Sequence, residues 1–336
     1  MSNVPAATRP LIAIVTPVYN GAAHLEDAIR SVQAQTYRPL VHCILDNAST
    51  DATPEIINRY LGAEIPIVTL RNPATISFQE NFNAVLKLIP PEAAYFRMLH
   101  ADDGMPPNAI EDMMAVANGA SDVVLVAGAE RLNGIDRPHF FPPECSVFEA
   151  NAMLARTFVD EAHIPSAHVL WRCDTIREGE DFFPTDMVEC IIAAVHRVLS
   201  RGGRAGFVHA HIADTRRYAG SGSLIDTFAP TVKAVLWEKL LFIEHYGPAA
   251  LSNVDYKFVQ RRFLRVFYRR LLWWAATGRW AMATRDYQRL RARGHSPNPL
   301  DFIVAVAVWP AYLFAKRVSQ PHAPARWPKD AVSLTS

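Results

Sequence analysis

The stretch Tyr95–Asp103, YFRMLHADD, runs from apolar side chains directly into a histidine and two adjacent carboxylates. Its first part has the length of a buried β-strand, and Pro90-Pro91 before it and Gly104 after it mark turns. Two neighbouring aspartates at the end of a strand repel each other unless a cation lies beside them. A divalent metal that carries a phosphate-bearing ligand is the cation that suits this position.

The same succession of strand and helix recurs around this stretch. Further strand-like runs lie at Leu11–Thr16, Val41–Leu45, Ile67–Leu70, Val123–Ala127, Ala167–Trp171 and Gly206–Ile212. Amphipathic helical patterns separate the first of these runs, and Pro17 is expected to end the first strand. Strands that alternate with helices predict an α/β fold around a mostly parallel central sheet with right-handed connections.

Polar residues stand where three of the predicted strands end: Thr16, Asp46 and the pair Asp102-Asp103. Open parallel sheets bind ligands beyond the carboxyl ends of their strands, so these side chains are expected to converge on one crevice. The alternative is structural, because aspartate also forms turns and caps helices. The coincidence at three strands favours a binding site.

The composition bounds the function. Half of the 336 residues are hydrophobic, which predicts a packed core, and the net charge of +1 argues against nucleic acid as a partner. The four cysteines are scattered without a CxxC pair, which is typical of core residues in a reducing compartment. The N-terminus has no apolar signal segment, so a cytoplasmic protein is expected.

The sequence predicts two regions: a catalytic domain over residues 1–225 and a helical region over 226–336. The second region interleaves arginines with aromatic residues, and its apolar run Phe302–Ala315 is shorter than the roughly 20 residues of a spanning helix. These helices either pack on the catalytic domain or attach peripherally to the anionic inner face of the membrane.

Three motifs together resemble the opening of family 2 glycosyltransferases, which have the GT-A fold. They are IVTPVYNGAAHLEDAIRSVQAQTY (14–37), LDNASTDAT (45–53) and HADD (100–103), with Ile76-Ser77 and Asn81 matching a further family motif. The resemblance is specific over Leu11–Met114 and looser to about Leu224. It implies an enzyme that uses a nucleoside-diphosphate sugar, with a UDP-sugar as the first choice, and Mn²⁺ or Mg²⁺.

The resemblance also implies roles for individual residues. Contacts with the nucleotide sugar are implied for Thr16, Pro17, Tyr19, Asp46, Asn47, Asn81, His100, Asp102 and Arg217. Asp46 would accept hydrogen bonds from the nucleoside, while Asp103, with Asp102 beside it, would hold the metal against the diphosphate. His100 stands where family members more often carry an acidic residue.

Asp186 is the candidate general base that the resemblance implies. The sequence places it in the first turn of a helix after Pro184-Thr185, where an aspartate also stabilises the helix dipole without any catalytic role. Asp181 and Glu180 are the nearby alternatives. His209 and His211 share a strand face, and packing is favoured for them over metal ligation.

One base on the face opposite the leaving group predicts inversion at the anomeric carbon, since no second nucleophilic carboxylate is evident. The acceptor is expected to be a glycan or a lipid-linked hydroxyl. A nucleotidyltransferase or a dehydrogenase is less favoured, because no glycine-rich phosphate loop follows the first strand. A non-catalytic nucleotide-sugar-binding or membrane-scaffold protein remains an alternative.

Overall fold

The computed structural model describes residues 9–137, 139, 141–158, 168–216 and 232–310, with only the backbone of 232–236. The chain divides into two compact units, the first ending at Glu238 and the second beginning at Lys239. This division falls within helix α8 (Val232–Ala250). The boundary expected near residue 225 lies outside the described residues.

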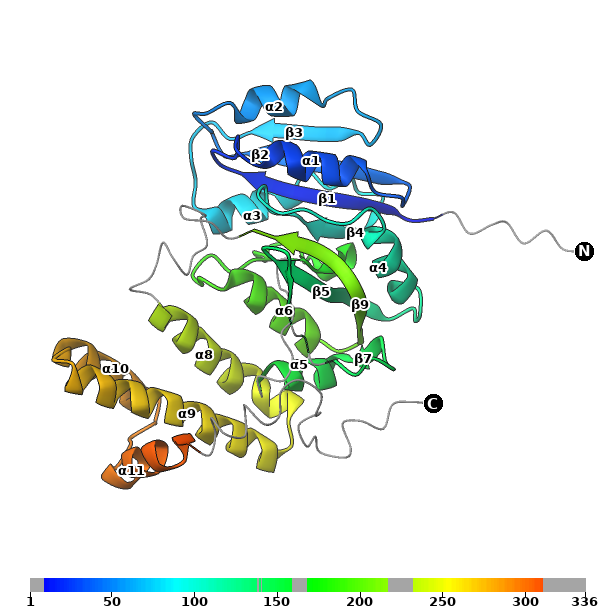
Figure 1. Cartoon of the computed structure of the whole chain (residues 1–336). Helices are drawn as coiled ribbons and strands as arrows, with labels where there is room; N and C mark the ends of the chain where they lie inside the picture. The colour runs from blue at the N-terminus through cyan, green and yellow to red at the C-terminus, as the bar shows by residue number, and fades with distance from the viewer. Residues whose placement is uncertain (1–8, 138, 140, 159–167, 217–231, 311–336) are drawn as a thin grey trace, which may run out of the picture. The chain divides into compact units, whose positions relative to one another are not determined.

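Four parallel strands form the first half of the central sheet, in the order β3-β2-β1-β4 (Figure 1). They are β1 (Leu11–Val18), β2 (Leu40–Asp46), β3 (Ile67–Arg71) and β4 (Ala93–Met98). In the register of these strands, Val18 lies beside Asp46 and Asp46 lies beside Arg71. The strand ends therefore meet at one edge of the sheet.

Strand β1 continues through Pro17 to Val18, so the expectation that Pro17 ends it was wrong. The last pair of the β1–β4 ladder is Val15 with Met98, and the N–H of Leu99 donates to the carbonyl of Val15. Because backbone groups alternate along a strand, the nitrogen of Pro17 faces the same side as Val15, beyond that ladder. The hydrogen bond that proline cannot donate is not needed there.

Helices connect these strands and cover the sheet. They are α1 (Leu25–Gln33), α2 (Thr53–Arg59), α3 (Phe78–Leu86) and α4 (Ala109–Ala117). Helices α1 and α4 bury apolar side chains against the face that carries Ile12 and Ile14. On the opposite face, the thiol of Cys43 donates to the carbonyl of Leu88, which follows α3. Both faces of the sheet are thus covered, as a buried parallel sheet requires.

The second half of the sheet mixes strand directions. Its strands are β5 (Val123–Leu132), β6 (Ile135–Asp136), β7 (Val147–Glu149), β8 (Leu170–Arg172) and β9 (Arg204–Thr215). Strand β8 lies between β4 and β5 and is antiparallel to both, while β9 is parallel to β5 and antiparallel to β7. The predicted α/β fold with a central sheet is confirmed.

Among the described residues of the first unit, the remaining helices are α5 (Ala150–Phe158), the short 3-10 helix η2 (Cys173–Thr175) and α6 (Cys190–Ser200). The second unit contains α9 (Asn253–Ala276), α10 (Trp280–Ala292) and α11 (Pro299–Ala307). Helix α9 buries Phe263, Phe267 and Trp274. The guanidinium of Arg269 donates to the carbonyl of Ala305 and lies 4.0 Å from the ring centroid of Trp309, so part of the arginine–aromatic pattern is internal packing.

Within the described ranges, no helix combines the length and the apolar character needed to span a membrane.

Candidate functional site

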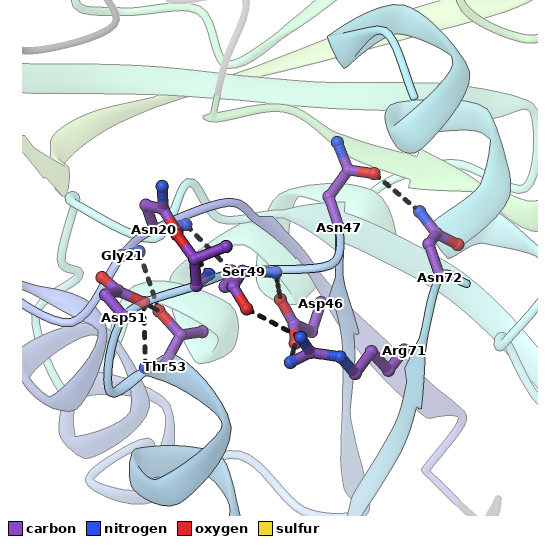
Figure 2. Close-up of polar contacts among 10 residues, drawn as sticks. Asn20, Gly21, Asp46, Asn47, Ser49, Asp51, Thr53, Arg71 and Asn72 are labelled. Atoms are coloured by element: carbon purple, nitrogen blue, oxygen red, sulfur yellow. Dashed lines mark hydrogen bonds and ion pairs between the residues drawn. The ribbon is translucent and has the colours of Figure 1, made fainter. Parts of the chain in front are cut away.

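The loops that follow β1 and β2 are joined by hydrogen bonds between the TPVYN and DNASTD motifs (Figure 2). The N–H of Asn20 donates to the hydroxyl of Ser49 at 2.9 Å, and the N–H of Thr50 donates to Oδ1 of Asn20 at 2.8 Å. Asn20 and Ala48 have positive φ angles of 49° and 58°, which fold both loops sharply. The two motifs are one structural unit.

A second set of contacts anchors these loops to the start of α2. The N–H of Gly21 donates to the hydroxyl of Thr53 at 2.9 Å, and the carboxylate of Asp51 accepts hydrogen bonds from Thr53 (Figure 2). The same carboxylate accepts a hydrogen bond from the N–H of Ala22. A Cβ at Gly21 would lie 2.5 Å from Cγ2 of Val18, so this position requires glycine. The carboxylate of Asp51 therefore anchors a turn.

Asp46 lies at the end of β2 and is buried, with both carboxylate oxygens engaged. Oδ1 accepts a hydrogen bond from the N–H of Ser49 at 2.9 Å, and Oδ2 pairs with the guanidinium of Arg71 (Figure 2). Arg71 is half exposed. The guanidinium of Arg71, at the end of β3, balances the charge of the buried carboxylate, and its other side is open to solvent.

An asparagine network continues from Asp46 towards helix α3. Oδ1 of Asn47 accepts hydrogen bonds from the side chain of Asn72 at 2.9 Å and from the N–H of Ile76 at 3.0 Å. The side chain of Asn72 also donates to Oδ1 of Asn81 at 3.1 Å. The structure thus brings Asp46, Asn47 and Asn81 into one polar wall.

The remaining residues of the TPVYN motif lie differently. The hydroxyl of Thr16 is fully buried and shares a 2.9 Å hydrogen bond with Nε2 of His42, so it faces the interior of the sheet. Pro17 is buried, whereas the ring of Tyr19 is 52% exposed. Of these three side chains, Tyr19 is the one that solvent and a ligand can reach.

The carboxylate of Asp103 is almost completely buried, at 2% exposure, and lies among nitrogen atoms. Its Oδ1 accepts a hydrogen bond from the N–H of Arg216 at 3.0 Å. Its Oδ2 lies 3.6 Å from Nδ1 of His100 and 3.6 Å from Nε2 of His168. Burying a carboxylate requires such neighbours.

Two buried basic residues beneath Asp103 were missed by the sequence analysis. Arg97 is fully buried within β4, donates to the carbonyl of Ile212 at 2.9 Å, and interacts electrostatically with Asp103. His168 is also fully buried and shares a 2.8 Å hydrogen bond with the hydroxyl of Thr215. An arginine inside an otherwise apolar strand was the available signal, because a buried charge needs a partner.

The two neighbouring aspartates differ in acidity. Burial acts to raise the pKa of Asp103, but the adjacent imidazoles of His100 and His168 outweigh it and the pKa lies below its ordinary value. Burial and the charge of Asp103 both raise the pKa of Asp102. The pKa of His168 falls to about 4, because burial disfavours its charged form.

The donor set at this position fits a divalent metal. His100, Asp102 and Asp103 each offer one ligand atom, and these atoms lie within 4.8 Å of one another. The repulsion that raises the pKa of Asp102 is what a bound cation would relieve. Asp102 and Asp103, which were predicted to hold a metal, thus lie in one group of possible ligands with His100, which was predicted to contact the nucleotide sugar.

The metal candidates lie next to the two loops described above. A Cβ at Gly21 would lie 3.5 Å from Cβ of Ala101, which places the loop after β1 against the HADD motif. The ring of His100 stacks on Phe82 of α3, with centroids 5.7 Å apart and planes at 24°. Helix α3 carries both Phe82 and Asn81, so it borders both groups of polar residues.

Asp186 is exposed and lies in a turn, since helix α6 begins only at Cys190. The expectation that it occupies the first helical turn was wrong. The N–H groups of Val188 and Glu189 donate to the carboxylate of Glu238, at 2.8 and 2.7 Å. The carboxylate that stabilises the N-terminus of α6 is therefore that of Glu238. Asp186 does not have this structural role, which was the alternative to its being a base.

The turn with Asp186 is fixed to α3. The side chain of Gln79 donates to the carbonyl of Met187 at 3.0 Å, and Asn83 makes two hydrogen bonds to the backbone of Phe183. Of the alternatives, Glu180 is paired with Arg197 and Arg201, whereas Asp181 is exposed.

The other candidates from the sequence lie outside this group or outside the described residues. Arg217 belongs to the segment 217–231, which the structure does not describe. Nε2 of His209 shares a hydrogen bond with the carbonyl of Cys145, and Nε2 of His211 is 2.9 Å from Oδ1 of Asp214. Arg216, which the sequence analysis passed over, donates from its guanidinium to Asp27 of α1 at 2.9 Å.

Residues 13–153 match the family model for glycosyl transferase family 2. Over 126 residues the chain is 32% identical to an uncharacterized glycosyltransferase of Rickettsia prowazekii, a match that covers 37% of this chain and 38% of that protein. The chain thus matches well under half of this relative's length. This segment carries the Asp46 loop and the HADD motif, and it is the part of the chain that is similar to the family 2 glycosyltransferases.

Solved structures of low sequence identity share the fold. The S. aureus TarS fragment 1-349 in complex with UDP-GlcNAc has a TM-score of 0.59 at 14% identity, covering 78% of this chain and 73% of that one. The mannosyltransferase PcManGT from Pyrobaculum calidifontis, in complex with GDP-Man and Mn²⁺, has a TM-score of 0.55 at 14% identity, covering 90% and 88%. These similarities confirm the predicted GT-A-type fold.

Proposed function

We propose that this protein is an inverting glycosyltransferase that moves a sugar from a nucleoside-diphosphate sugar to an acceptor hydroxyl. The observation that carries the proposal is the grouping, within the family 2 segment, of a polar wall around Asp46 with the carboxylates of Asp102 and Asp103. A nucleoside needs hydrogen-bonding groups of the first kind, and a metal-bound diphosphate needs carboxylates of the second kind.

The nucleoside would lie against Tyr19, Asp46, Asn47 and Asn81. The exposed ring of Tyr19 can stack on a base, and the asparagine network offers amide donors and acceptors beside it. A UDP-sugar is the first candidate, because the TarS fragment of the same fold binds UDP-GlcNAc, while the GDP-Man complex of PcManGT makes a GDP-sugar the second.

Asp103 and Asp102 would hold Mn²⁺ or Mg²⁺, and the metal would neutralise the charge that develops on the departing diphosphate. Asp102 can also contact the ribose or the sugar. Oδ1 of Asp103 is held by the N–H of Arg216, and its Oδ2 faces the imidazoles of His100 and His168 at 3.6 Å, which supports a carboxylate positioned before the donor binds.

Asp186 would take the proton from the acceptor hydroxyl. Its exposure leaves it accessible to an acceptor, and Gln79 and Asn83 hold its turn against the helix that also borders the HADD motif. A base that acts from the face opposite the leaving group produces inversion.

The second unit would attach the enzyme to an anionic membrane surface on which a lipid-linked acceptor is presented. Leu300, Ile303 and Val306 of helix α11 are each more than half exposed and recur at a spacing of three residues. An exposed apolar helix face beside numerous arginines is typical of helices that lie in a membrane interface.

Slow hydrolysis of the donor tests the catalytic proposal without knowledge of the acceptor. The protein is incubated with UDP-, GDP- and dTDP-sugars with and without Mn²⁺, and release of nucleoside diphosphate is measured beside the melting temperature. The cognate donor should raise the melting temperature by mass action and release its nucleotide only with metal. Stabilisation without release, with any acceptor, would favour the non-catalytic alternative.

A further inference from the structure

His100 occupies an unusual place in the candidate metal site. It stands where the family resemblance implies an acidic residue, and its ring is held by stacking on Phe82. Its Nδ1 lies 3.6 Å from Oδ2 of Asp103, which is longer than a hydrogen bond allows. Its Nε2 is buried and has no hydrogen-bond partner among the described residues.

These features leave the imidazole of His100 without a full structural role. The distance of 3.6 Å between Nδ1 and Oδ2 of Asp103 is too long for a hydrogen bond, so Nδ1 is open to a cation beside that carboxylate. Two ligands bound about 2.1 Å from one cation lie roughly 3.0–3.4 Å apart, depending on the angle between them. The separation of 3.6 Å between Nδ1 and Oδ2 is close to that spacing.

His168 faces the same carboxylate oxygen but does not share this role. Its Nε2 already shares a hydrogen bond with Thr215 at 2.8 Å, and its side chain is fully buried beneath Asp103. His100 is 29% exposed and belongs to the group of ligand atoms that lie within 4.8 Å of one another. Of the two histidines, only His100 is partly exposed and has, next to Asp103, a ring nitrogen that makes no hydrogen bond to a described residue.

We propose that His100 is a nitrogen ligand of the metal that Asp102 and Asp103 hold, and that it makes this site selective for Mn²⁺ and Co²⁺ over Mg²⁺. Mg²⁺ strongly prefers oxygen ligands, whereas imidazole binds transition-metal ions well. An aspartate at this position would give an all-oxygen site. The inference rests on the proposed function, because it assumes that the carboxylate pair binds a metal.

Electron spin-echo spectroscopy of bound Mn²⁺ reports a coordinated nitrogen directly and does not depend on activity. The full-length protein with Mn²⁺ and UDP should show the ¹⁴N coupling of a bound imidazole. The variants His100→Asp and His100→Gln should lose this coupling, and the second keeps the size of the side chain in case the first does not fold. His209→Gln removes a histidine whose Nε2 shares its hydrogen bond with the Cys145 carbonyl, and should retain the coupling.

Metal affinities give the second readout. The ratio of the Mg²⁺ to the Mn²⁺ dissociation constant, measured by titration calorimetry, should fall at least about tenfold in His100→Asp, because the nitrogen that favours Mn²⁺ is lost. Bound Mn²⁺ without ¹⁴N coupling in the wild type, or coupling that survives both His100 variants, would overturn the inference and leave the proposed function standing. Failure of the wild type to bind either Mn²⁺ or nucleotide would overturn both.

Discussion

The side chain of Asn83 makes two hydrogen bonds to the backbone of Phe183, although 100 residues separate them in the sequence. Oδ1 of Asn83 accepts from the N–H of Phe183 at 2.8 Å, and Nδ2 of Asn83 donates to the carbonyl of Phe183 at 2.7 Å. Asn83 lies on helix α3, two residues from Asn81 of the polar wall. One helix therefore positions both the proposed nucleoside contacts and the turn that carries Asp186.

Replacing Asn83 by alanine should reduce turnover more than it reduces nucleotide affinity, because the turn with Asp186 loses its attachment. Leaving the backbone groups of buried Phe183 without partners should also lower the free energy of unfolding by about 1–3 kcal/mol. Steady-state kinetics and urea denaturation measure the two effects. Asn58→Ala, an exposed asparagine of α2, is the matched control and should change neither.

Asp186→Asn should leave nucleotide binding intact and reduce kcat by about 100-fold or more, because an amide cannot accept the acceptor's proton. Asp181→Asn is the control, since Asp181 is an exposed aspartate of the same loop region. Nucleotide titration and single-turnover kinetics separate binding from chemistry. Normal turnover in Asp186→Asn, with a loss in Asp181→Asn, would move the base assignment to Asp181.

Asp103→Asn should abolish transfer and remove the dependence of nucleotide binding on metal, because the carboxylate proposed to hold the metal is lost. Calorimetric titration of UDP with and without Mn²⁺ measures this directly. Asp51→Asn, at a carboxylate that only anchors a turn, should keep the metal effect. Equal metal dependence in wild type and Asp103→Asn would show that the metal is held elsewhere.

Acid should destabilise the fold through His42 beneath β1. Burial lowers the pKa of His42 from 6.5 to about 3, so the unfolded chain binds a proton in this range that the folded chain does not. Stability should therefore fall as the pH drops from about 6.5 towards 3, by up to about 1.4 kcal/mol per pH unit for this histidine. Urea denaturation gives the free energy of unfolding at each pH from 7 to 4.5. This free energy should fall less steeply with decreasing pH in His42→Gln than in the wild type. An equal dependence on pH in both proteins would assign the effect to other groups.

Ile303→Glu should weaken binding to anionic vesicles at least about tenfold, because burying an isoleucine side chain contributes roughly 1.5–3 kcal/mol. Flotation with phosphatidylserine-containing liposomes at low salt measures the bound fraction. Ile135→Glu makes the same change at an exposed isoleucine of β6 and should have little effect. A wild-type protein that stays in the soluble fraction would exclude the membrane proposal.

The sequence predicts the first half of the fold well because its apolar runs are local and continuous. Strands β1 to β4 and the carboxylates at their ends follow from residues 11–103 alone. Strand β7 is three residues long and carries no alternation that a pattern could reveal, whereas β8 overlaps the strand-like run predicted at Ala167–Trp171. Their antiparallel directions depend on pairing with β4, β5 and β9, which are distant in sequence.

The start of α6 illustrates why a site residue can be misplaced. Thr185-Asp186 resembles a helix start, but the carboxylate that satisfies the first N–H groups is that of Glu238, 50 residues beyond Val188. The role of Arg97 was likewise missed, because the carbonyl to which it donates, that of Ile212, lies 115 residues away in the sequence. Contacts of this kind depend on tertiary structure, which no local pattern contains.

Strand β8 has a consequence for how the chain can be handled. It supplies the hydrogen bonds on the side of β4 that β1 leaves open, with Arg97 opposite Leu170. A fragment that ends at residue 153, where the family match ends, would leave this edge of β4 without its partner strand and open to other molecules. During synthesis, the nascent chain lacks β8 until residue 172 has left the ribosome, so this edge of β4 has no pairing strand in that interval.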